Sequence, residues 1–323
     1  MKNSVLLIIY FAAYYLGIIQ LFYSLNRRRQ RVLVFHHIIP DKFVDDSFEQ
    51  RIVCTAESRF EKIMAIVNNR FRVTTDICVP NTAVITFDDG YRAALIADKV
   101  LSKYGNNAYF FIPVDNIGAG PLWIDHAMLW FAHVADGEYT INGDTFVLTT
   151  QSSRQRAFSQ SVNKLYVNYD ADGYIEQLDN LSPFSSLQTD EEYAMLRLRG
   201  LTAEELDLLK LKGHKIGAHS RKHDILSKLP PNELEDDFRS CYALVHTTYN
   251  TDIYAYPYGH PRDVSEQVVG ACRKSGFSKA FINETNTSPT DFTIGRLNVG
   301  LSENKYEIEA RLSGFTEWLK TII

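Results

Sequence analysis

Short apolar runs alternate with helix-like stretches along most of this chain, and this alternation limits the folds open to it. Seven runs rich in β-branched and aromatic residues recur between the helix-like segments. The pattern favours a parallel sheet or barrel over an antiparallel sandwich, because parallel strands need a crossover between them. The expected strands are Val32–Phe35, Ala83–Phe87, Ala108–Ile112, Lys215–Ala218, Ile253–Tyr256, Lys279–Ile282 and Thr293–Val299.

Helices are expected in the intervening segments. Within residues 232–249, apolar residues repeat at three- and four-residue steps, as one buried helix face requires. Thr202 and Glu205 have the spacing of a capping box, which predicts a helix start. Residues 120–200 interrupt the alternation and are interpreted as a partly helical insertion. The expected helices are Ser47–Asn69, Arg92–Tyr104, Thr202–Lys212, Asn232–Tyr249, Asp263–Ser275 and Glu303–Lys320.

Residues 5–23 form an apolar segment in which Gln20 is the only strongly polar residue. As one helix it would be about 28 Å long at ~1.5 Å per residue, close to the thickness of a bilayer core. Four arginines follow it between positions 27 and 31, whereas only Lys2 precedes it. The positive-inside rule therefore predicts a membrane-associated chain with its main domain in the cytoplasm. A periplasmic or extracellular orientation is the alternative, and a buried or interfacial helix is the alternative to a membrane span.

The composition excludes several classes of protein. The 323 residues are 45% hydrophobic and 23% charged, which is typical of a folded globular chain. Acidic residues (39) outnumber basic ones (34), so there is no basic surplus for nucleic acid. The four cysteines lie far apart without a CxxC pair, which argues against a zinc ribbon or a disulfide scaffold.

Polar residues with metal-binding chemistry follow three of the expected strands. Asp88 and Asp89 come directly after one strand, and adjacent buried carboxylates are costly unless a cation neutralises them. His219 and His223 follow another strand with a spacing that suits two imidazoles on one metal. Two histidines and one carboxylate would leave a metal position open for water. Tyr258 sits in a Pro-Tyr-Gly turn able to aim a backbone N–H at a reacting oxygen. Taken singly, each feature is more often structural: the aspartate pair a solvated turn, the histidine pair a surface or core accident, and the Pro-Tyr-Gly segment a simple turn.

In combination, these motifs resemble a known family. Residues 86–90 (TFDDG), 219–223 (HSRKH) and 254–259 (YAYPYG) are similar to the motifs of the NodB-type polysaccharide deacetylases, carbohydrate esterase family 4. The resemblance runs from about Val32 to Val299. It implies an α/β fold, a distorted (β/α)7 barrel with an insertion at about 120–200, here preceded by one hydrophobic N-terminal helix. The expected division is residues 1–31 for the membrane helix and basic flank, and 32–323 for the catalytic domain.

The resemblance also assigns roles to residues. It implies that Asp89, His219 and His223 bind one divalent metal ion and that Asp88 is the general base. The Tyr258 backbone N–H would help to hold the oxyanion. Zinc suits two histidines with an aspartate, although cobalt, nickel or manganese fit the same ligands.

Two departures from the family pattern need substitutes. The late L-x-H motif that usually supplies the general acid is absent, because residues 294–299 read IGRLNV. His36 or His37 could replace it from the first strand, and His36 is preferred because it follows the strand directly. The usual arginine of the third motif is also missing, and we hypothesise that Arg296 supplies the cation near Asp88.

The expected function is removal of the N-acetyl group from an N-acetylated sugar. The process would be synthesis of a bacterial surface polysaccharide such as O-antigen, capsule or exopolysaccharide, with a lipid-linked or nucleotide-linked precursor as substrate. The alternatives are a deacylase for another N-acyl group such as formyl, a catalytically silent sugar-binding barrel, and a structural membrane-anchored protein. Trp123 is a candidate aromatic wall for the sugar, with core packing as its alternative. The sugar, its linkage and the oligomeric state are not determined by the sequence.

Overall fold

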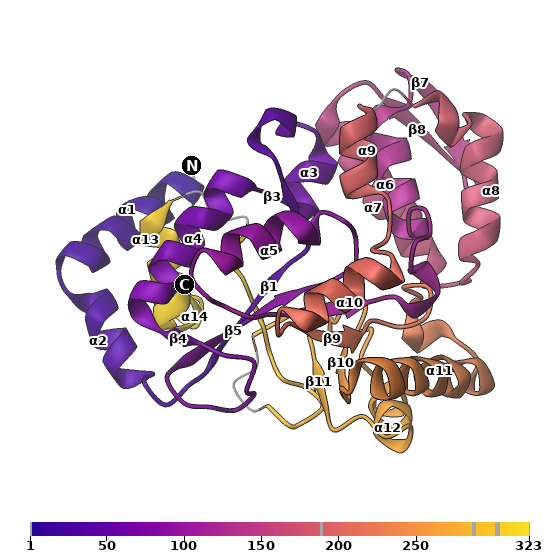
Figure 1. The fold of residues 1–323 in the computed structure, drawn as a ribbon. Helices are drawn as coiled ribbons and strands as arrows, with labels where there is room; N and C mark the ends of the chain where they lie inside the picture. Colours follow the sequence, from indigo (N-terminus) through magenta and orange to yellow (C-terminus); the bar gives the residue numbers. More distant parts are fainter. Residues whose placement is uncertain (1, 188–189, 286–288, 301–303, 323) are drawn as a thin grey trace.

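A curled parallel sheet forms the centre of the computed structural model, which describes residues 2–187, 190–285, 289–300 and 304–322 (Figure 1). Every neighbouring pair of strands in this sheet is parallel. A two-residue strand, β4 (Arg72–Val73), also pairs with β5. Across the sheet the strands are β11 (Lys279–Phe281), β10 (Ile253–Ala255), β9 (Lys215–Ala218), β6 (Tyr109–Ile112), β5 (Thr82–Phe87), β1 (Arg31–Phe35) and β12 (Leu297–Asn298).

The two edges of the sheet are brought together by one segment near the end of the chain. Ile294 forms a parallel bridge with Phe281 at the end of β11, and Leu297 pairs with Leu33 of β1. Residues 294–298 therefore connect the last strand to the first and curl the sheet. The seven expected strands and their parallel arrangement are confirmed. The last strand is shorter than expected, because Ile294 makes only an isolated bridge.

Both faces of the central strands are buried. Successive side chains of a strand point to opposite faces, so the unbroken burial of β1 and β5 requires cover on each side. Helices cover one face of the sheet. The side chains of the other face pack against one another inside the curled sheet. The helices that pack on the sheet are α4 (Glu57–Arg70), α5 (Ala94–Ser102), α10 (Ala203–Leu211), α11 (Pro231–Tyr249) and α12 (Glu266–Lys274).

The capping box predicted for α10 is confirmed. The Glu205 N–H donates to Thr202 Oγ1 at 3.2 Å, and the Thr202 N–H donates to the Glu205 carboxylate at 3.0 Å. The single helix expected over Ser47–Asn69 is wrong. That segment divides into α3 (Phe48–Val53), β3 (Cys54–Ala56) and α4, because β3 pairs with β2 (His37–Ile39) directly after β1.

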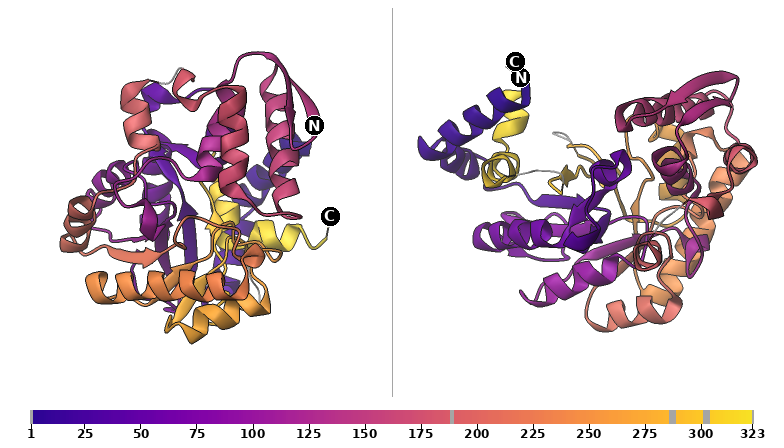
Figure 2. Two further views of the ribbon diagram at one scale, coloured as in Figure 1. Left: turned by 90° about the vertical axis from the view of Figure 1, so that its right-hand side faces the viewer. Right: turned by 90° about the horizontal axis from the view of Figure 1, so that it is seen from above.

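Residues 120–200 form a layer at one end of the molecule (Figures 1 and 2). Buried aromatic and aliphatic side chains, among them Trp130, Phe158 and Leu178, give this layer its own core. The layer is built from α6 (Trp123–His133), β7 (Gly137–Ile141), β8 (Asp144–Leu148), α7 (Gln151–Leu165), α8 (Ala171–Leu181) and α9 (Glu191–Arg197). A short 3-10 turn in this layer covers Phe184–Ser186. Three others lie outside it, at Asp41–Phe43, Val114–Asn116 and Leu226–Lys228.

Helices from the two ends of the chain pack together at the opposite end of the molecule (Figures 1 and 2). They are α1 (Lys2–Tyr15), α2 (Ile18–Leu25), α13 (Lys305–Ser313) and α14 (Phe315–Leu319). The C-terminal segment was expected to be one helix, but Gly314 ends α13 with φ of +87° and α14 begins after it. The expected start of that helix, Glu303, lies outside the described residues.

The single N-terminal helix expected over residues 5–23 is also wrong. Gly17 adopts a left-handed φ of +77°, which only glycine takes up readily, and α1 and α2 meet there at an angle of 77°. In the described part of the chain, no single helix is long and apolar enough to cross a membrane. The bent pair meets that requirement by length and composition only.

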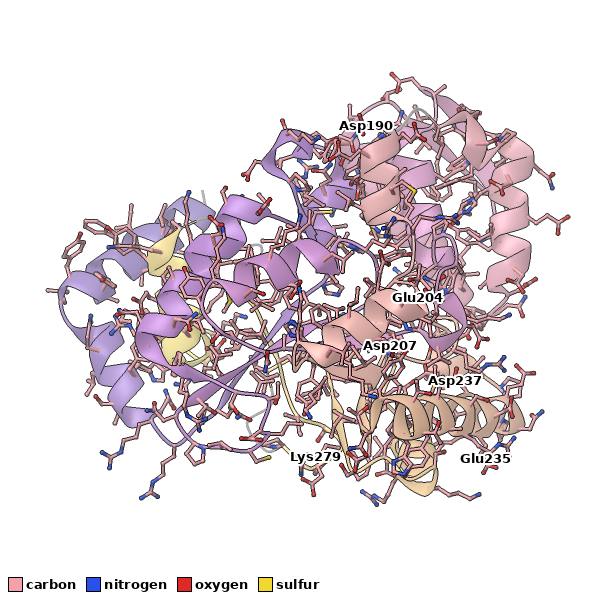
Figure 3. All side chains as sticks on the ribbon, in the orientation of Figure 1. Asp190, Glu204, Asp207, Glu235, Asp237 and Lys279 are labelled. Atoms are coloured by element: carbon pink, nitrogen blue, oxygen red, sulfur yellow. The ribbon has the colours of Figure 1, made fainter. Side chains whose placement is uncertain are left out.

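A buried carboxylate on α11 makes stability depend on pH. Burial raises the pKa of Asp237 to about 7, although the Arg221 N–H donates to it at 2.8 Å (Figure 3). In the unfolded chain an aspartate titrates near ~3.9. Between these values the folded chain keeps a proton that the unfolded chain has released, so the stability of the fold falls as pH rises.

We expect Asp237→Asn to remove this loss, since the amide oxygen can still accept from Arg221. Its Tm should exceed that of the wild type by ~2 °C or more at about pH 8 and should show no gain at about pH 4. Glu235→Gln is the control on the same helix, because Glu235 is exposed and its ion pair with Lys274 lowers its pKa. Identical Tm-against-pH curves for Asp237→Asn and the wild type would contradict this account.

Candidate metal centre and catalytic site

The two adjacent aspartates lie in a tight turn at the carboxyl end of β5. The Asp88 N–H donates to the Phe35 carbonyl oxygen at 3.0 Å, which joins the turn to the end of β1. Asp89 and Gly90 both have positive φ, +72° and +65°. A Cβ atom at Gly90 would lie 2.9 Å from Ile112 Cγ2, so only glycine lets the turn approach β6 this closely. Both carboxylates are buried as a result.

Asp89, His219 and His223 converge as the sequence predicted. The Oδ1 atom of Asp89 lies 3.6 Å from His219 Nε2 and 3.4 Å from His223 Nε2. All three candidate ligand atoms lie within 4.8 Å of one another. This spacing is compatible with an ion held between the three atoms.

The surroundings of the two histidines suit metal binding. His219 Nδ1 lies 2.7 Å from the Ala255 carbonyl oxygen, so Nδ1 carries the proton and Nε2 keeps its lone pair toward Asp89. His223 Nδ1 lies 3.3 Å from the Tyr258 hydroxyl. The His223 N–H donates to Ser220 Oγ at 2.7 Å, which holds the loop between the two histidines. These residues therefore fit a divalent metal ion with two nitrogen ligands and one oxygen ligand.

The electrostatics of Asp89 favour its charged form. Burial alone would raise the pKa of this carboxyl, but its hydrogen-bonding interactions with His219 and His223 lower it well below the ordinary value. The same contact with Asp89 outweighs burial at His223 and raises the pKa of that imidazole. The group therefore holds an ionised carboxylate that attracts positive charge, whether a proton on histidine or a metal ion.

Asp88 points to a different partner. The Arg296 guanidinium binds it in a bidentate pair, with Nη1–Oδ1 and Nη2–Oδ2 distances both of 2.7 Å. Arg296 Nη1 also donates to Thr86 Oγ1 at 3.2 Å. Both members of the pair are almost fully buried. Burial alone would raise the pKa of Asp88, but Arg296 and the neighbouring histidines lower it, so the carboxylate is ionised.

The two candidate acids occupy different environments. His36 is partly exposed, and its imidazole is close enough to Asp88 and Asp89 to contribute to the lowering of the pKa of both carboxyls. His37 is buried with Nε2 3.5 Å from Asp89 Oδ2, and burial followed by the charge of Arg197 lowers its pKa well below the usual value. Within the described residues, neither ring nitrogen of His37 has a hydrogen-bond partner. His36 is thus the histidine with access to solvent.

Tyr258 lies beside the ligands in a left-handed conformation, with φ of +59°. Among the residues that the structure describes, its backbone N–H has no acceptor. Its ring packs edge-on against His223 at 4.8 Å between centroids. Trp123 is buried at the same place, and its indole N–H donates to the His223 carbonyl oxygen at 3.0 Å. Trp123 therefore supports the histidine loop as a packed residue.

A buried polar network behind the site was not predicted. Asp125 on α6 accepts from the Tyr91 hydroxyl and from Arg197 Nη2, both at 2.7 Å. Asp125 also groups with His37 and Asp89 closely enough to share an ion. The insertion thus contributes to the support of the site. Tyr91 directly after the Asp-Asp-Gly turn is the one local signal, since Asp125 and Arg197 lie far along the chain with no diagnostic spacing.

The model of one protein family matches this sequence. The family is described as polysaccharide deacetylase, and the match covers residues 138–278. The matched residues make up less than half of the chain, and over that stretch the chain is similar to polysaccharide deacetylases. The matched stretch includes His219, His223 and the Tyr258 turn, and it begins after Asp88 and Asp89.

Solved structures of such deacetylases share the fold. A polysaccharide deacetylase from Bacillus cereus is similar at 16% identity, covering 87% of this chain and 67% of that one with a TM-score of 0.52. IcaB from Ammonifex degensii matches at 15% identity over 90% and 97% of the two chains, with a TM-score of 0.52. A de-N-acetylase from Aggregatibacter actinomycetemcomitans matches at 13% over 87% and 98%, with a TM-score of 0.51. A search of curated protein sequences finds no significant match.

The geometry predicts that metal content depends on His219 and Asp89. We expect about one divalent ion per wild-type chain and a loss of at least tenfold in metal affinity in His219→Ala and Asp89→Ala, because each removes a ligand. Elemental mass spectrometry of the purified chains measures this. His260→Ala is the control, since His260 is exposed and contacts Glu284 instead. Equal metal content in the wild type and both ligand variants would show that the metal lies elsewhere.

Proposed function

We propose that this chain is a metal-dependent hydrolase that removes the N-acetyl group from an N-acetylated sugar. One observation carries the proposal. Asp88, held in its ionised form by Arg296, is adjacent in the chain to Asp89, which faces two histidines across an ion-sized space. A base next to a three-residue metal site is the arrangement that amide hydrolysis requires.

Each residue of the site has a defined task in this proposal. A bound divalent ion would polarise the acetyl carbonyl and acidify water. The Asp88 carboxylate accepts the proton of the attacking water, and Arg296 holds that carboxylate in its charged form and in one orientation. The Tyr258 N–H donates to the oxygen that becomes negative, for which such a donor contributes roughly 3–4 kcal/mol in other enzymes. His36 then donates a proton to the departing amine.

The proposals for the sugar carrier and the biological process rest on the sequence analysis. We propose a lipid-linked or nucleotide-linked precursor of a bacterial surface polysaccharide as the substrate. Removal of formyl or another acyl group in place of acetyl is the nearest alternative, since none of the contacts described above distinguishes one acyl group from another. A silent sugar-binding barrel is disfavoured, because Asp88 and Arg296 form a buried charged pair that binding alone does not need.

The test of function is acetate release. N-acetylated oligosaccharides of different linkage and the corresponding nucleotide-linked sugars are incubated with the metal-loaded chain, and released acetate and formate are quantified. We expect acetate from at least one substrate and at least a hundredfold lower rate with Asp88→Asn. Formate without acetate would favour the alternative deacylase. Binding of sugars without release of either acid would favour the silent barrel.

Arg296 should affect turnover without affecting metal content. We expect Arg296→Lys to lower kcat at least tenfold, because a lysine cannot reproduce the bidentate contact that orients Asp88. Lysine is chosen over alanine, since an unpaired buried carboxylate would cost about 3–5 kcal/mol of fold stability. Elemental analysis and thermal unfolding of the same preparation are the controls. Unchanged kcat would show that Asp88 is positioned without Arg296.

The general acid can be identified from the leaving group. A sugar amine needs a proton as it departs, whereas the nitrophenolate of an activated acetate ester does not. We expect His36→Gln to lose at least a hundredfold in N-deacetylation while retaining most of its esterase rate. His37→Gln should lower both rates together, because His37 contacts the ligand Asp89. The reverse pattern would assign the acid to His37.

A further inference from the structure

The helix pair α1–α2 carries an exposed apolar surface that the fold leaves uncovered. Positions 5, 8, 11 and 15 recur every three or four residues and so share one face of α1, which is 49–67% exposed. At the bend, Leu16 is 74% exposed. More than half of the exposed large apolar side chains in the described residues belong to α1, α2, the bend between them and the C-terminal end of the chain. Those in this surface, here called the terminal patch, are Val5, Leu7, Ile8, Phe11, Tyr15, Leu16, Leu21, Leu25, Trp318 and Ile322.

The opposite side of the helix pair is fixed to the rest of the molecule. Tyr10, Ala13 and Ile19 are buried against α13 and α14. The Tyr23 hydroxyl donates to Glu309 at 2.7 Å, and Asn26 Nδ2 donates to the Ser313 carbonyl oxygen at 2.9 Å. The pair is therefore a packed layer with one buried side and one apolar exposed side.

The shape of this layer does not suit a membrane span. The 14 residues of α1 measure about 21 Å at ~1.5 Å per residue, less than a bilayer core of ~30 Å. The chain then turns by 77° at Gly17, so α2 does not extend α1 along the same axis. To span a membrane, the pair would have to straighten and leave its contacts with α13 and α14. An orientation parallel to the membrane surface keeps those contacts.

The charge beside the terminal patch identifies its partner. Arg27, Arg28 and Arg29 follow α2 directly, all three are exposed, and within the described residues none forms an ion pair. A second copy of the chain on this face would bring two such triplets close together with no acid to offset them. An anionic lipid surface offers acyl chains for the apolar side chains of the patch and negatively charged headgroups for the arginines. The aromatic rings of Phe11, Tyr15 and Trp318 are of the kind enriched at membrane interfaces.

We propose that the terminal patch docks the chain on an anionic lipid bilayer, with α1 and α2 lying in the plane of the interface. This replaces the membrane-spanning helix expected from the sequence. The positive-inside rule applies to helices that span a membrane. Because the proposed helix pair does not cross the bilayer, the rule no longer predicts on which side of the membrane the domain lies. The proposal is independent of the deacetylase chemistry.

Vesicle sedimentation of the full chain tests the proposal. We expect binding to vesicles containing phosphatidylglycerol, at least tenfold weaker binding to phosphatidylcholine alone, and release from the pellet by alkaline carbonate. Ile8→Glu with Leu16→Glu should abolish binding, and replacement of the three arginines by glutamine should weaken it at least tenfold. Leu211→Glu is the control, because Leu211 is more exposed than Ile8 or Leu16 but lies on α10.

Three outcomes would overturn the proposal. Resistance to carbonate extraction would indicate a span, and absence of vesicle binding with dimers in light scattering would indicate a second copy. Equal binding by Ile8→Glu/Leu16→Glu and the wild type would place the contact elsewhere. Acetate release from a soluble oligosaccharide, measured in the same variants, should not change, so failure of docking and failure of the enzyme proposal are distinguishable.

Discussion

The buried pair of Asp88 and Arg296 is the interaction on which the architecture of the site depends. Two adjacent carboxylates are removed from water at the end of β5, and each needs its own positive partner. Arg296 fills this role for Asp88 and leaves Asp89 to face the histidines and any bound cation. Two neighbouring aspartates therefore have different partners: Asp88 faces an arginine, and Asp89 faces two histidines. The Asp88–Arg296 pair also joins the end of β5 to the segment next to β12, and these two strands lie on either side of β1.

The sequence predicted the arrangement of the site where polar residues directly follow the expected strands. The seven strands, the convergence of Asp89 with the two histidines and the proximity of Arg296 to Asp88 were all predictable, because the carboxyl ends of parallel strands meet at one edge. Two helix breaks were not predicted from the sequence. Gly17 and Gly314 each divide a segment that was expected to be one helix. The Tyr91–Asp125–Arg197 network was equally hidden, since its members are distant in the chain and become partners only when the insertion folds against the barrel.

The insertion lies at one end of the sheet and the terminal helices at the other. The two layers differ in how close they come to the site. The insertion reaches the site directly through Asp125 and Trp123. The terminal helices lead instead into the start of β1, and the five residues of that strand, ~17 Å at ~3.3 Å per residue, separate them from His36. A bilayer contact at the terminal patch would thus leave the catalytic end of the strands clear of the lipid.

Left-handed backbone conformations are concentrated in the catalytic loops. Asp89, Ser220, His223 and Tyr258 all have φ between +59° and +72°, although none of them is glycine. Such conformations cost of order 1–3 kcal/mol each, so they persist only where the surrounding structure enforces them. Glycine at these positions would relax the backbone but would remove a candidate metal ligand, a loop hydrogen bond or the ring that packs against His223. Variants selected for heat resistance alone would therefore tend to accumulate in these loops and remove the side chains that the proposed chemistry needs.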